Sequence, residues 1–156
     1  MKCGCCGKYI GDISFDKSYK MPDEAWALPE AEKNNRTQID SDLCRLDERY
    51  LLRGVAYIPV IDSEKSYGWG VWVEVSEQNF FEYVDNYEND NSSRPSFLGV
   101  VANKIPSYEN TLSLTVQVQL GNETQRPTFT FIDKEHLLTQ EQVNGVSIEK
   151  IHSFSN

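Results

Sequence analysis

The N-terminal cysteines are the residues whose type and spacing are best suited to chemistry. Cys3 and Cys6 form a C-x-x-C motif, and Gly4 and Gly7 allow the sharp backbone turn that brings two thiolates to one metal ion. Thiolates at this spacing are typical of one half of a tetrahedral zinc site. The motif therefore predicts zinc binding, and it needs two further ligands.

The remaining ligands have to come from distant parts of the chain. Cys44 is the cysteine outside the N-terminal cluster, and His136 and His152 are the two histidines. We predict a structural zinc ion, and its expected ligands are Cys3, Cys6, Cys44 and His136, with Cys5 as a substitute for one of them.

Two other interpretations of the cysteines stay open. In the first, the cluster carries free thiols and Cys44 is a small core residue. In the second, the C-x-x-C motif cycles between dithiol and disulfide, but catalytic motifs of this kind usually open a helix after a strand. Residues 1–2 are too short to supply that strand. The sequence therefore favours redox chemistry least.

Two tryptophans are the next candidates, for a ligand site or an interface. Residues 68–75 alternate as in a strand, so Trp69 and Trp72 fall on opposite faces. We expect one of them in the core, whereas the other could be exposed or line a groove with Tyr57 and Tyr67, where it could anchor a partner. The favoured interpretation is that these aromatic side chains cover a helix or loop.

Arg53 interrupts an apolar strand beside Gly54. Because a buried arginine is usually paired, we expect an ion pair with Glu74 or Asp47 across the hairpin. Anion binding is the alternative role for Arg53. A predicted solvated acidic face contains Asp40, Asp42, Asp47 and Glu48.

The pattern of apolar residues predicts an α+β fold. Alternation and β-branched or aromatic composition predict strands over residues 50–61, 68–75, 111–120 and 127–132, and we expect a last strand over 146–151. Residues 97–103 are either a short apolar strand or a turn-rich connection. Helical spacing predicts helices over residues 22–33 with a break at Pro29, over 77–89 and over 139–144. We expect one domain over residues 1–156, with a Cys-rich knuckle at 1–12 and a body at 13–156. In that body, an antiparallel sheet built from hairpins carries two to three helices on one face.

Charge indicates the class of partner. The chain has 24 acidic and 15 basic residues, and the formal net charge of −9 repels nucleic acids and anionic membranes while attracting basic proteins. We therefore expect a basic protein partner, and neither a nucleic acid nor a membrane. Cys3 follows Met1 and Lys2 without the apolar stretch of a signal peptide, so we expect a cytoplasmic protein. The oligomeric state stays open.

Several long segments resemble the bacterial family known as domain of unknown function 2199. The resemblance runs through nearly the whole chain and includes Cys3-x-x-Cys6-Gly7, SDLCRLDERYLLRG around Cys44, GWGVWVEVSEQNF from Gly68, IPSYENTLSL from Ile105 and HLLTQEQVNGV from His136. Family members often carry a histidine shortly after the C-x-x-C-G motif. This chain has Lys8, Tyr9 and Ile10 there, so no ligand role carries over. The resemblance implies a bacterial cytosolic protein and no mechanism.

The motifs of common enzyme classes are missing from the sequence. It contains no glycine-rich nucleotide loop, no nucleophile elbow and no HExxH. The sequence therefore favours a non-enzymatic interaction module, in which zinc would only stabilise the N-terminal segment. A narrower hypothesis is an acidic immunity-type protein that neutralises a basic toxin. The alternative is a small-molecule-binding protein or an enzyme whose pocket lies between sheet and helix and holds Arg53 and Trp72.

Overall fold

This computed structural model describes residues 15–154 of the chain. Its strands are β1 (Asp16–Ser18), β2 (Thr37–Ile39), β3 (Leu43–Leu46), β4 (Arg49–Pro59), β5 (Ser66–Val75), β6 (Phe97–Val101), β7 (Thr115–Gln119) and β8 (Thr128–Phe131). Its helices are α1 (Asp23–Trp26), α2 (Glu30–Arg36), α3 (Glu77–Asp85), α4 (Leu137–Asn144) and α5 (Ile148–Phe154).

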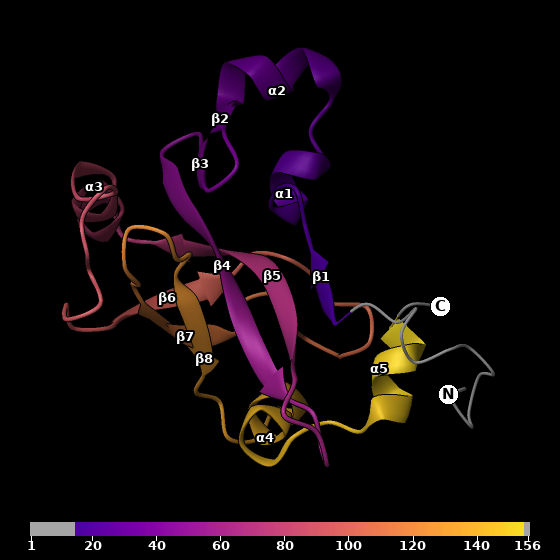
Figure 1. The fold of residues 1–156 in the computed structure, drawn as a ribbon. Coiled ribbons are helices and arrows are strands. Elements are labelled where there is room, and N and C mark those ends of the chain that lie inside the picture. The colour runs from indigo at the N-terminus through magenta and orange to yellow at the C-terminus, as the bar shows by residue number, and fades with distance from the viewer. Residues whose placement is uncertain (1–14, 155–156) are drawn as a thin grey trace.

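Five of the strands close into a barrel, which forms the centre of the fold (Figure 1). Consecutive strands from β4 to β8 pair antiparallel, and β8 meets β4 in parallel at Val55 and Thr128. β3 and β2 extend the sheet from β4, and β1 lies parallel to β5. The prediction of an α+β fold with antiparallel hairpins is confirmed. The sheet closes on itself, however, which the sequence did not predict.

Closure depends on a glycine in β4. A Cβ atom on Gly54 would lie 2.4 Å from the Pro127 carbonyl oxygen and 2.6 Å from the Phe129 ring. The neighbouring Val55 amide donates a hydrogen bond to that same carbonyl over 2.9 Å. β8 can therefore reach β4 only because residue 54 has no side chain.

Each face of β5 contributes to a separate hydrophobic cluster. Trp69 and the valines that alternate with it, Val71, Val73 and Val75, belong to the main core inside the barrel. Trp72 points the other way and packs with Cys44, Leu46 and Leu51 in a smaller cluster on the outer side. Strict alternation along a strand explains this division.

The helices do not gather on one face of the sheet, so that part of the prediction is wrong. α3 and α4 lie at opposite ends of the barrel, α2 lies beyond β2 and β3, and α1 lies between β1 and α2 (Figure 1). The predicted break at Pro29 is confirmed, because it separates α1 from α2. In a closed barrel no single outer face remains for all helices to cover.

The expected last strand over residues 146–151 is also wrong. Val146 forms only an isolated bridge with Val60, and the chain then enters α5. The Ser147 hydroxyl accepts a hydrogen bond from the Lys150 amide over 3.2 Å, as at a helix N-cap. This local cap favours a helix over a strand of the same apolar residues.

The predicted Cys-rich knuckle at residues 1–12 lies outside the described residues. Within residues 15–154, no helix is both long and apolar enough to cross a membrane.

We predict that Gly54→Ala strongly destabilises the fold. The added methyl group would overlap the Pro127 carbonyl, and overpacking of this severity costs about 3 kcal/mol of unfolding free energy. Urea denaturation measures this loss. Gly68→Ala is the matched control in the same hairpin, because its Cβ would come no closer than 3.2 Å to the Val55 side chain. Equal losses for the two variants would contradict the proposed role of Gly54 in closure.

Candidate functional site

One edge of β4 pairs first with β3 and then with β8. The candidate site surrounds the point where this partner changes. β3 pairs with the first residues of β4, and β8 pairs with β4 at Val55. Between these pairings, the Arg53 amide donates to the Asp42 carbonyl over 3.0 Å. The segments that precede β3 and β8 therefore meet beside Arg53. Their meeting brings the side chains of Asp42 and Arg126 together from distant parts of the sequence.

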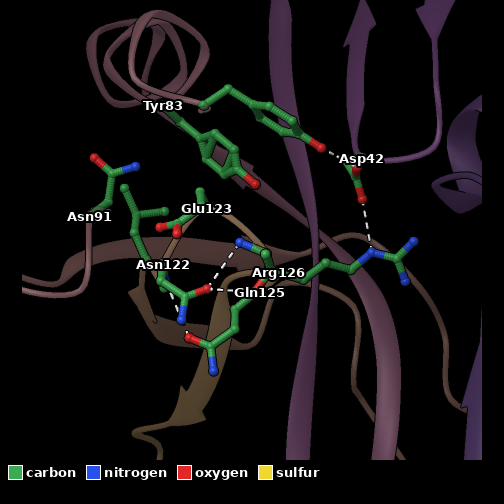
Figure 2. A pocket seen from close by; sticks show the side chains of 11 residues that line it. Asp42, Tyr83, Asn91, Asn122, Glu123, Gln125 and Arg126 are labelled. Atoms are coloured by element: carbon green, nitrogen blue, oxygen red, sulfur yellow. Dashed lines mark hydrogen bonds and ion pairs between the residues drawn. The ribbon is translucent and has the colours of Figure 1, made fainter. Parts of the chain in front are cut away.

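Asp42 is the centre of a hydrogen-bonded network that holds three segments together (Figure 2). Its Oδ1 accepts a hydrogen bond from Arg126 Nε over 2.8 Å, and its Oδ2 accepts one from the Tyr87 hydroxyl over 2.6 Å. The Asp40 carboxylate accepts from the Asp42 and Leu43 amides over 2.9 and 2.8 Å, which fixes the turn before β3. Asp42 thereby links the turn before β3 to the loop before β8 and to the segment after α3.

The network shifts the titration of its members. Burial acts to raise the pKa of Asp42, but the hydrogen bonds from Tyr87 and Arg126 outweigh it and hold the pKa below its ordinary value. The hydrogen bond to Asp42, followed by burial, raises the pKa of Tyr87 to about 12. Asp42 is therefore ionised and Tyr87 neutral at pH 7, as their hydrogen bond requires.

A small polar cavity of about 160 Å³ lies between α3, the segment after it and the loop that joins β7 to β8. Figure 2 shows the Tyr83 hydroxyl directed toward this loop. Asn122 Oδ1 accepts hydrogen bonds from the Thr124 amide and hydroxyl, each over 2.9 Å, so the loop supports itself. The cavity walls also carry the side chains of Asn91 and Glu123. They offer hydrogen-bonding groups and little apolar surface.

α3 presents an acidic surface to solvent. The Ser76 hydroxyl caps the helix by accepting from the Asn79 amide over 3.1 Å, and Phe80 and Tyr83 bury its inner side. Its outer side and the segment after it carry five exposed acids, which are Glu77, Glu82, Asp85, Glu88 and Asp90. No basic residue occurs between Lys65 and Arg94. Among residues 15–154, no basic side chain forms an ion pair with any of the five.

An apolar groove of about 370 Å³ lies between α3 and the β2–β3 hairpin. Its apolar lining includes Ile39, Leu43, Tyr50, Phe81 and Val84. The Phe81 side chain stands 43% exposed, although it contacts Tyr50 with a ring separation of 5.4 Å. We call the five acids, Phe81, Tyr87 and this groove the α3 face.

The two tryptophans are both buried, so the expectation that one is exposed or lines a groove is wrong. Trp69 packs against Phe154 of α5, with ring centroids 4.9 Å apart. Trp72 Nε1 donates to the Tyr19 carbonyl over 2.9 Å beneath the segment that leads from β1 to α1. The favoured interpretation, packing of these side chains against a helix or loop, holds for both. Tyr57 is exposed, whereas Tyr67 is buried against Trp69 with ring centroids 5.0 Å apart.

Arg53 does not form the expected ion pair. Glu74 pairs with Arg49 over 2.5 Å, and Asp47 pairs with Arg36 over 2.8 Å. Arg53 Nη1 donates to the Ser41 carbonyl over 3.2 Å, and its buried Nε has no hydrogen-bond partner among the described residues. Burial and then the charge of Arg126 lower the pKa of Arg53, and the charge of Asp42 acts in the opposite direction.

The proposed zinc ligands fall in three places. Cys3, Cys5 and Cys6 lie outside the described residues. Cys44 is fully buried in β3, where loss of solvent raises the pKa of its thiol to about 12. His136 caps α4, at the opposite end of the molecule from β3 (Figure 1), and its Nδ1 accepts from the Leu138 amide over 3.1 Å. Within residues 15–154, no three His, Cys, Asp or Glu side chains gather in a way that could hold a metal ion. Zinc binding by the N-terminal cysteines stays a prediction.

We predict that Asp42→Asn destabilises the protein at neutral pH. Because the pKa of Asp42 is lowered in the folded state, its carboxylate stabilises the fold above the unfolded pKa, and this contribution is lost as the pH falls through the folded pKa. Removing the charge weakens two hydrogen bonds near solvent, at a cost of about 2 kcal/mol in unfolding free energy at pH 7.

Chemical denaturation of wild type and Asp42→Asn between neutral and strongly acidic pH measures this contribution. The stability difference should shrink as the pH falls, and the exposed-acid control Asp85→Asn should change stability by less than about 0.5 kcal/mol. A difference that stays constant with pH would refute the assignment to Asp42.

The family comparison agrees with the resemblance found in the sequence. The model of a family described as an uncharacterized protein conserved in bacteria matches residues 2–146. No curated protein and no solved structure matches the chain. The match includes all barrel strands, α3 and the Asp42 network. The chain therefore belongs to the family domain of unknown function 2199.

Proposed function

We propose that this protein is a non-enzymatic interaction module that binds a basic protein through the α3 face. The observation that carries the proposal is the set of five exposed acids that pair with no basic side chain in the described part of the chain. Carboxylates whose charge no basic side chain of the described residues neutralises are available to Lys and Arg side chains of another molecule. A surface of one sign also increases the rate at which an oppositely charged partner arrives.

The apolar parts of the same face supply anchoring. Phe81 and Tyr87 are both exposed, and aromatic side chains often contribute most of the binding energy at interfaces. The groove beside Phe81 has room for an aliphatic or aromatic side chain of the partner. A basic segment that also carries one apolar residue therefore matches the α3 face in charge and in shape.

The framework beneath the α3 face supports a preorganised surface. The Ser76 cap fixes the start of α3, its buried residues fix its inner side, and the Tyr87–Asp42 hydrogen bond holds the segment after it. A surface that is ordered before binding loses less conformational entropy when the partner arrives. This supports direct docking onto α3.

An immunity-type role is a narrower hypothesis that agrees with binding of a basic protein. A basic toxin neutralised by an immunity-type protein belongs to the proposed partner class, and a cytoplasmic location fits such a role. A zinc ion that stabilises the N-terminal cysteines is a further hypothesis that the proposal does not depend on.

Selection from a random peptide library on the immobilised protein tests the proposal. We expect enriched peptides to combine Lys or Arg with one aromatic or aliphatic residue. Fluorescence anisotropy should show at least about tenfold weaker binding to the charge-reversed variant Glu82→Lys/Asp85→Lys, because both the attraction and its steering effect are reversed.

The control Glu64→Lys/Glu135→Lys changes net charge by the same amount on exposed residues outside the α3 face. It should weaken binding by less than about threefold, since distant charges are screened at physiological salt. Enrichment of peptides without basic residues, or equal losses for the two charge-reversed variants, would rule out the α3 face as the binding surface.

A further inference from the structure

A second, larger groove runs along the outer side of the barrel where β8 meets β4. Its volume is about 750 Å³. Val55 and Tyr57 of β4 form one side, and Thr128 of β8 and the loop before it form the other. None of its lining residues is Asp or Glu, whereas the chain as a whole carries 24 acids and a net charge of −9. The groove is thus an acid-free surface on an acidic protein.

Arg126 supplies positive charge to this groove. Its Nε is occupied by Asp42, whereas its two terminal nitrogens form no hydrogen bond to another described residue. Figure 2 shows these nitrogens on the side of the guanidinium away from the polar cavity. A guanidinium with two free terminal donors has the geometry that holds a carboxylate or a phosphoryl group.

Arg53 carries a second guanidinium, which is near enough to Arg126 to feel its charge. Arg53 is on the same outer side of β4 as Val55, two residues earlier, and its buried Nε has no hydrogen-bond partner within the described part of the chain. Burial and then the charge of Arg126 lower the pKa of Arg53, and the charge of Asp42 acts in the opposite direction. Among the described residues, Asp42 alone forms an ion pair with Arg126, so these two cations and one carboxylate leave a positive charge that a bound anion would balance.

The remaining lining is rich in hydroxyl and amide groups. The hydroxyls of Tyr57 and Thr128 form no hydrogen bond within the described residues, whereas the Ser92 and Thr124 hydroxyls, which lie along the same groove, donate to Asp90 and Asn122 over 2.6 and 2.9 Å. The free hydroxyls of Tyr57 and Thr128 suit the hydroxyl groups of a ligand, and they add no charge that would oppose an anion.

We propose that this groove binds a small hydroxylated organic anion, whose phosphoryl or carboxylate group is held by Arg126 and whose hydroxyl groups contact Tyr57 and Thr128. This site is separate from the α3 face, and the two are joined through the Arg126–Asp42–Tyr87 hydrogen bonds and through Ser92, which donates to Asp90.

NMR titration of the ¹⁵N-labelled full chain tests the site with three probes. Ribose 5-phosphate carries a phosphoryl group, gluconate carries a carboxylate, and ribose is a neutral control. We expect saturable shifts of backbone amides around residues 124–128 with one or both anions and none with ribose. The stronger of the two anions identifies the preferred acidic group.

Two variants separate the site from general charge effects. Arg126→Gln should weaken anion binding at least about tenfold, because a charge-assisted bidentate contact is lost. Thr128→Glu should weaken it by a similar factor while the Arg126–Asp42 pair stays intact. Thr130→Glu is the matched control, since Thr130 is exposed on the same side of β8 and does not line the groove. It should change affinity by less than about threefold.

Three results would overturn binding of an anion in this groove. Absence of saturable shifts with both anions would remove the site. Equal binding of ribose would remove the role of the acidic group. Equal effects of Thr128→Glu and Thr130→Glu would show that the anions respond to overall charge and not to this groove.

Discussion

The contact between β8 and the backbone of β4 at Gly54 is the constraint on which the rest of the structure depends. It closes the barrel, and it leaves no space for a side chain at that residue. Closure sets the position of the loop before β8 and so brings Arg126 to Asp42. Asp42 in turn holds Tyr87 and the end of α3. One backbone contact thereby positions both candidate binding surfaces.

The Arg126–Asp42 pair also divides the surface by charge. On the Asp42 side lies the α3 face, whose acids pair with no basic residue of the described chain. On the Arg126 side lies a groove without acids. Mixed charges would weaken the attraction of each surface for its own ligand class, so this separation favours a basic partner on one side and an anion on the other.

Features set by neighbouring residues could be predicted from the sequence, whereas features set by distant contacts could not. Alternation in residues 50–61 and 68–75 predicted the β4–β5 hairpin, and helical spacing in residues 77–89 predicted α3. The bond between Asp42 and Arg126 joins segments with no local signal for each other, so Asp42 was assigned to a solvated face although its side chain is only 14% exposed. An exposed Trp72 stayed open at the level of sequence for the same reason, because the β1–α1 segment that covers it comes from far earlier in the chain. In the sequence, the glycine at position 54 within an apolar strand was the one local feature related to closure of the barrel.

The most direct test of the central claim, that the α3 face is a docking surface for a basic partner, is the salt dependence of association. Stopped-flow fluorescence with a bound basic peptide gives association and dissociation rate constants over a range of ionic strength. The account predicts that the association rate constant falls steeply as salt is added, while the dissociation rate constant changes little. An association rate constant that does not depend on salt would contradict electrostatic docking at α3.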